Sequence, residues 1–110
     1  MTSELAAKQC KPCEGKADAL SPEHIKKYHK ELDSGWELIE DHHIEKEFSF
    51  DGYEPAVEFT NTVAQLAQQE NHHPDILLSY GKVKVTLWTH KTGGLTENDF
   101  VLAAKVEDCR

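Results

Sequence analysis

The feature that most constrains the fold is an alternation of apolar and polar side chains late in the chain. Val83, Val85 and Leu87 are separated by polar residues, which predicts a strand with one face on a hydrophobic core. Gly81-Lys82, just before it, predicts a tight turn from another strand over residues 76–80. Two strands joined by so short a turn form an antiparallel hairpin.

A second pair of strand patterns covers residues 36–40 and 44–50. Helical patterns lie before, between and after the two pairs, which gives the order α-β-β-α-β-β-α. Adjacent strand pairs are most simply hairpins, and helices of this number can cover one side of the sheet that they form. The sequence therefore predicts an α+β fold, a four-stranded antiparallel sheet with three helices on one face.

The ends of the helices are marked by capping residues. Ser21 is a good N-cap for the first helix, and Thr96 with Asp99 forms a capping box for the last. The second helix runs from Tyr53 or Pro55 to Glu70. Its start is ambiguous, because Asp51 and Glu54 also have capping-box spacing whereas Pro55 disfavours helical dihedrals at Glu54. Asn71 is predicted to end this helix in the left-handed conformation.

Length and composition narrow the class of protein. The 110 residues predict one domain over residues 20–110, preceded by a flexible arm over residues 1–19. A net charge of −8 argues against a nucleic-acid partner. No apolar run reaches the ~18 residues that span a bilayer, so no membrane partner is expected. The absence of a signal-peptide pattern and of an even set of cysteines predicts a cytoplasmic protein.

Cys10 and Cys13, followed by His24 and His29, superficially have the order of zinc-finger ligands. The segment between the pairs is about two residues short, and the histidines are five positions apart, so a regular helix points them to different sides. We interpret this segment as a flexible tail carrying two thiols.

Histidines form the candidate site. His72 and His73 precede Pro74, which favours extended backbone and so directs the two imidazoles to opposite sides. His90 shares strand parity with Trp88, an arrangement that suits a flat aromatic ligand, stacked on the indole and protonated by the imidazole. Each residue also has a structural explanation, as a helix terminator, a strand end or, for Asp99, a helix cap. A further pair, His42 and His43, is predicted to lie in a solvated hairpin turn.

At these residues the sequence resembles the pterin-4a-carbinolamine dehydratases. The resemblance covers about residues 21–105. It rests on His72-His73-Pro74, Tyr80, His90 and Asp99, and on the surrounding Gly35-Trp36, Phe48-x-Phe50, Ala56-x-x-Phe59, Gly81-Lys82-Val83-x-Val85, Thr89-His90 and Gly94-Leu95-Thr96-x-x-Asp99.

The resemblance implies an acid–base elimination of water from a 4a-hydroxytetrahydropterin to give the quinonoid dihydropterin, which recycles the cofactor of aromatic amino-acid hydroxylases. It implies catalytic roles for His72, His73 and His90, with no metal and no cofactor. It also implies a homodimer, in which the sheet extends across two subunits, or a homotetramer. The residues expected to support the site or bind the substrate are Asp99, Pro74, Trp88, Glu70 and Trp36.

One position departs from the family pattern. Members usually carry a charged residue four positions before the first histidine, where this chain has Gln68. Two other functions remain open. The three histidines could bind a metal, although adjacent histidines facing opposite ways are poor joint ligands. The chain could also be a non-catalytic interaction module, since animal members of the family act as dimerisation cofactors of a homeodomain transcription factor.

Overall fold

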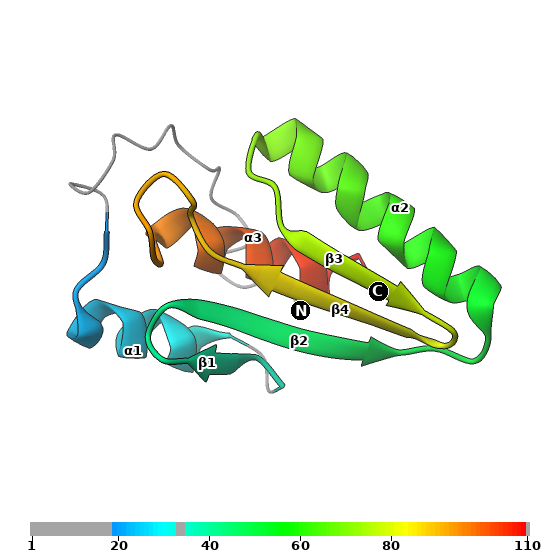
Figure 1. Cartoon of the computed structure of the whole chain (residues 1–110), viewed down its shortest axis with the longest axis horizontal. Helices are drawn as coiled ribbons and strands as arrows, with labels where there is room; N and C mark the ends of the chain where they lie inside the picture. The colour runs from blue at the N-terminus through cyan, green and yellow to red at the C-terminus, as the bar shows by residue number, and fades with distance from the viewer. Residues whose placement is uncertain (1–18, 33–34, 110) are drawn as a thin grey trace.

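The computed structural model describes residues 19–32 and 35–109, and its elements follow the predicted order (Figure 1). Residues 1–18, with Cys10 and Cys13, lie outside the described residues, so the flexible arm stays a prediction. The described elements are α1 (Pro22–Glu31), β1 (Glu37–Ile39), β2 (His43–Ser49), α2 (Tyr53–Glu70), β3 (Asp75–Ser79), β4 (Lys82–Leu87) and α3 (Glu97–Glu107).

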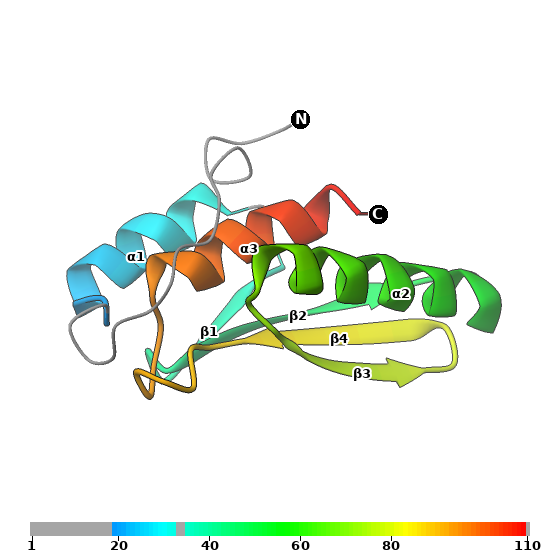
Figure 2. The same ribbon diagram turned by 90° about the horizontal axis from the view of Figure 1, so that it is seen from above.

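The four strands form one antiparallel sheet in the order β1-β2-β4-β3. The central strand β4 pairs with β2 on one side and β3 on the other, so that Val83 lies opposite both Phe48 and Leu78. Figure 2 shows α1, α3 and α2 side by side on one face of this sheet. The predicted α+β architecture is confirmed.

The alternation in β4 decides which face of the sheet is covered. Val83, Val85 and Leu87 are fully buried in the core between sheet and helices. Burial of each side chain contributes ~1.5–3 kcal/mol. The polar residues between them face the opposite, open side, where Lys84 Nζ lies 3.0 Å from Glu45 Oε2 of β2. A shift of register by one residue would exchange these two faces.

The central helix α3 is buried on nearly all sides. Phe100, Val101, Leu102 and Ala103 have no exposed surface. Four consecutive buried residues fit a helix enclosed by neighbours rather than one with a single apolar stripe, and α3 lies between α1 and α2 above the sheet (Figure 2). The first turn of α3, which carries Asp99, is therefore inside the protein.

The structure decides the ambiguous start of α2 and confirms its predicted end. Gly52, with a φ of 119°, is the N-cap, and no side chain caps this end, so α2 begins at Tyr53, the earlier of the two possible starts, without the capping box that the spacing of Asp51 and Glu54 allowed. Asn71 adopts the predicted left-handed conformation, with φ 53° and ψ 40°. Among the described helices, none combines the length and apolar character needed to cross a bilayer.

Two strands are shorter than predicted because other partners take their backbone groups. The first strand begins after Trp36, whose carbonyl accepts a hydrogen bond from His29 Nε2 at 2.6 Å. Strand β4 ends at Leu87, and beyond it the Thr89 N–H donates to the Gly94 carbonyl at 2.8 Å across an isolated bridge. The segment that carries Trp88 and His90 is thus attached to the following loop rather than to the sheet.

The side chain of Tyr28 on helix α1 contacts helix α3. The Tyr28 hydroxyl donates to Glu97 Oε2 at 2.6 Å, and the Tyr28 ring stacks on Phe100 at a centroid distance of 5.6 Å. The hydrogen bond to Glu97, with burial and the charges of Glu97 and Glu31, raises the pKa of Tyr28 to about 12. The protonated phenol of Tyr28 therefore stabilises the folded state fully below a pH of about 10. This contribution is lost as the pH rises through about 12.

We expect one of the three tyrosines to ionise late in an alkaline titration followed by phenolate absorbance. Replacing Glu97 with Gln removes the charge and should move this phase toward the ordinary tyrosine range. Tyr28→Phe assigns the phase, because it should delete it altogether. A late phase that persists in Tyr28→Phe would contradict the assignment.

Candidate active site

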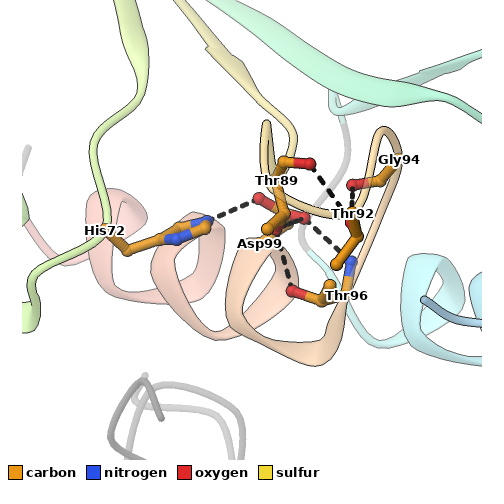
Figure 3. A network of polar contacts seen from close by, with 6 residues as sticks. All are labelled: His72, Thr89, Thr92, Gly94, Thr96 and Asp99. Atoms are coloured by element: carbon orange, nitrogen blue, oxygen red, sulfur yellow. Dashed lines mark hydrogen bonds and ion pairs between the residues drawn. The ribbon is translucent and has the colours of Figure 1, made fainter. Parts of the chain in front are cut away.

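The candidate site is built around the carboxylate of Asp99, whose side chain has no exposed surface. Oδ2 accepts from the Thr96 backbone N–H at 2.9 Å and from the Thr89 hydroxyl at 2.8 Å. Oδ1 lies 2.6 Å from His72 Nε2. Figure 3 shows Asp99 between His72 on one side and the two threonines on the other. The predicted capping box of α3 is confirmed, and its carboxylate also holds an imidazole.

Hydrogen-bond directions in this network follow from the number of protons available. Thr89 has one hydroxyl proton, which it donates to Asp99, so in the 2.9 Å contact between the two threonine hydroxyls Thr96 is the donor. Every neighbour of the carboxylate is then a donor, which is the arrangement that an ionised acid requires. Among the described residues, no buried side-chain nitrogen or oxygen lacks a hydrogen-bond partner.

His72 is fixed at both its backbone and its ring. Because Asn71 turns left-handed, the His72 N–H donates back to the Ala67 carbonyl at 3.1 Å and closes the end of α2. The imidazole is 10% exposed, and Nε2–H donates to Asp99. In the neutral ring the lone pair is therefore on Nδ1, the state in which a histidine can accept a proton. This is the carboxylate–imidazole pairing found in general-base sites.

His73 points away from this network, as the proline rule predicted. Its ring is exposed, and Nε2 lies 3.0 Å from Gln68 Oε1. An amide oxygen only accepts, so His73 Nε2 carries the proton and Nδ1 carries the lone pair. Gln68, the position that departs from the family pattern, therefore fixes the tautomer of His73 without adding a charge. Pro74 follows and is the last residue before β3.

Beyond β4 the side chains alternate between two sides. Thr89 is buried and joins Asp99, whereas Trp88 is half-buried and His90 is exposed. The rings of Trp88 and His90 are in contact, with centroids 4.0 Å apart and planes at 50°. The predicted pairing of imidazole and indole is thus present.

The contacts that the structure gives to the three predicted histidines do not join them to one another. His72 contacts Asp99, His73 contacts Gln68 and His90 contacts Trp88. His72 and His73 come shortly after the end of α2, and His90 comes shortly after the end of β4. Their convergence on one ligand stays a prediction.

Two of the predicted supporting residues have partners farther along α3. Glu70 Oε2 lies 3.9 Å from Lys105 Nζ. Trp36 is 4% exposed, packs edge-on against Phe48 and donates from Nε1 to Glu107 Oε1 at 2.9 Å. Glu107 is eight residues, or ~12 Å along the helix, from Asp99. Trp36 is therefore a core residue in this structure, and its predicted role at the site has no contact to support it.

Sequence reasoning missed Thr89, which links β4 to Asp99. Its position could have been found, because alternation puts Thr89 on the core side of the strand, where a hydroxyl needs a partner. It also described His42 and His43 as solvated. Both are half-buried, and the His42 ring contacts Trp88 at a centroid distance of 4.6 Å. Within the described residues, no group of three His, Cys, Asp or Glu side chains could hold a metal ion.

Comparison with known proteins identifies the family of the chain. The model of the family described as Pterin 4 alpha carbinolamine dehydratase matches residues 18–109. The chain belongs to this family. A dehydratase of this kind is a hydro-lyase.

Relatives match over nearly the whole chain. A protein of Alkaliphilus metalliredigens (strain QYMF) is 51% identical over 105 residues, which are 96% of this chain and 95% of the relative. One of Rubrobacter xylanophilus is 45% identical over 105 residues, 96% of this chain and 97% of the relative. Both are named "Putative pterin-4-alpha-carbinolamine dehydratase".

A solved structure shares the fold. The crystal structure of a transcriptional coactivator/pterin dehydratase from Brucella melitensis superposes with a TM-score of 0.76 at 31% identity. The match covers 82% of this chain and 96% of that one.

The role of Asp99 can be tested by Asp99→Asn. The new amide can be placed in two orientations. In one its NH₂ group faces the donors of Thr89 and Thr96, and in the other it faces the Nε2–H of His72, so a donor meets a donor in both. We expect the free energy of unfolding in urea to fall by ~1–3 kcal/mol, the cost of unsatisfied buried polar groups. Asp108→Asn makes the same chemical change at an exposed position of the chain and should stay within ~0.5 kcal/mol of the wild type. Equal effects of the two substitutions would contradict the proposed importance of the network.

Proposed function

We propose that this dehydratase removes water from a 4a-hydroxytetrahydropterin and so recycles the cofactor of aromatic amino-acid hydroxylases in the cytoplasm. The observation that carries the proposal is the pair of adjacent imidazoles whose tautomers are fixed by different partners. His72 donates Nε2–H to the buried Asp99, and His73 donates Nε2–H to Gln68. Each therefore keeps Nδ1 for proton transfer.

The reaction needs one acid and one base beside a planar ring. Protonation of the 4a-hydroxyl lets it leave as water, while the lone pair of the adjacent ring nitrogen forms the new C=N bond and the proton of that nitrogen is removed. His72 and His73 exchange these two protons in our proposal. His90 positions or protonates the pterin, and Trp88 stacks on it. Positioned acid–base groups supply ~10²–10⁴-fold, which is adequate for such a labile alcohol.

Asp99 has a supporting role in this scheme. Its carboxylate keeps the proton of His72 on Nε2 and balances the charge of the imidazolium that forms when Nδ1 accepts a proton. No step calls for a metal or an organic cofactor, and none is proposed.

The test is a stopped-flow assay of dehydration on synthetic 4a-hydroxytetrahydropterin. We expect His73→Ala to lower kcat by ~10²-fold or more, because a positioned proton-transfer group is lost, while unfolding stays as in the wild type. His24→Ala is the matched control, since His24 is exposed on α1, and it should retain activity. A wild-type protein that does not accelerate the reaction would refute the proposed function, and a fully active His73→Ala would remove His73 from the mechanism.

We also propose that the protein assembles into a homodimer or homotetramer. Among residues 19–32 and 35–109, three large apolar side chains are exposed, Tyr53 by 50%, Leu77 by 62% and Tyr80 by 78%. Leu77 is on β3, which forms an edge of the sheet, and the stacked rings of Tyr53 and Tyr80 lie 6.4 Å apart by centroid. An apolar side chain on an edge strand favours pairing with another strand.

For this assembly we expect a mass in sedimentation of at least twice the monomer's, and a lower one in Leu77→Lys, which puts a charge on the strand edge. Asp108→Lys places the same side chain at an exposed position outside the sheet and should leave the mass unchanged. A monomeric wild type would contradict the proposed assembly.

A second candidate function has one specific observation in its favour. The Brucella melitensis protein is titled both a transcriptional coactivator and a pterin dehydratase. An interaction role for this chain would act through an exposed surface, and it would survive His73→Ala, whereas dehydration would not.

A further inference from the structure

The indole of Trp88, on the open face of the sheet, contacts the imidazole of His42 as well as that of His90. The ring of His90 lies 4.0 Å from the indole by centroid, and the ring of His42, from the turn between β1 and β2, lies 4.6 Å from it. Trp88 is not part of the buried core cluster. Two imidazoles on a half-exposed tryptophan therefore do not serve the packing of the core.

His42 is held in place by its neighbour. His42 Nδ1 lies 3.0 Å from His43 Nδ1, so one of the two nitrogens donates and the other accepts. His43 Nε2 is 3.4 Å from Glu45 Oε1, and this carboxylate favours a proton on Nε2. His43 Nδ1 is then the acceptor in the neutral ring, and His42 Nδ1–H is the donor. Glu45 and His43 together determine which nitrogen of the His42 ring carries the proton.

The backbone that presents His42 is the tight turn between β1 and β2. Glu40 and Asp41 have φ angles of 53° and 54°, and the His42 N–H closes the turn on the Ile39 carbonyl at 2.9 Å. Positive φ at both central residues is typical of the short turns that join antiparallel strands. The pairing of Ile39 with His43 holds this turn, and the turn places His42 beside both His43 and Trp88.

We propose that His42 is a positioning residue for the Trp88 indole and, through it, for the flat ring of the substrate. The proposal rests on the proposed function, in which Trp88 stacks on the pterin. The His42 ring fixes the tilt of the indole from one side, and the indole presents its remaining surface beside His90. His42 exchanges no proton with the substrate, so its contribution is to binding.

Two substitutions separate the ring of His42 from its hydrogen bond. His42→Asn keeps a donor for His43 but has no ring, whereas His42→Phe keeps a ring and loses the donor. We expect His42→Asn to raise KM for 4a-hydroxytetrahydropterin by about 3- to 10-fold, the contribution of an aromatic pair, with kcat within about 2-fold. His42→Phe should restore KM to within about 2-fold of the wild type. His24→Ala, on an exposed face of α1, should change neither constant.

The outcomes against the proposal are equally specific. A fall in kcat at constant KM, with no rescue by Phe, would make His42 a proton-transfer residue. An unchanged KM in His42→Asn would leave it without a role in binding. Either result overturns the proposal.

A separate readout distinguishes failure of this proposal from failure of the proposed function. The ring-current shift that the Trp88 indole imposes on the His90 Hε1 proton can be followed by NMR without substrate. We expect it to change in His42→Asn and to be kept in His42→Phe. If the wild type does not dehydrate the pterin, the proposed function fails, and a shift that is the same in all variants refutes the positioning of Trp88 independently.

Discussion

The structure depends on one buried charge, the carboxylate of Asp99. An unpaired carboxylate with no exposed surface would cost several kcal/mol, so its position requires all of its donors at once. Those donors come from the cap of α3, from Thr89 two residues beyond β4, and from His72 just after the C-cap of α2. The same carboxylate thereby begins a helix, attaches a strand to it and sets the tautomer of an imidazole. Structural and chemical tasks are not separable at this residue.

The end of β4 connects the interior of the protein with the open face of its sheet. Thr89 points inward to Asp99, and its neighbours Trp88 and His90 are in contact with each other on the other side. His72 bonds to Asp99 in the interior, whereas His42 contacts Trp88 on the open face. The Thr89 N–H donates to the Gly94 carbonyl, and the Thr89 carbonyl accepts from the N–H groups of Thr92 and Gly93, so this segment is attached to the loop.

Most of the fold was predictable because it follows local rules. The period of two in β4, the cap at Ser21 and the left-handed Asn71 depend on residues a few positions apart, and all three are found in the structure. Where a prediction was wrong, a competing contact explains it. Trp36 lies outside the first strand, and its carbonyl accepts a hydrogen bond from His29.

By itself, the sequence determined the family, the order of elements, the capping box of Asp99 and the opposite directions of His72 and His73. These follow from residue type and spacing, which act over one or two turns of chain. Only the tertiary structure decided that the capping carboxylate also binds His72, 27 positions away, and that His42 reaches Trp88. A hydrogen bond or ring contact between distant segments depends on how the helices pack on the sheet, and no local pattern encodes that distance.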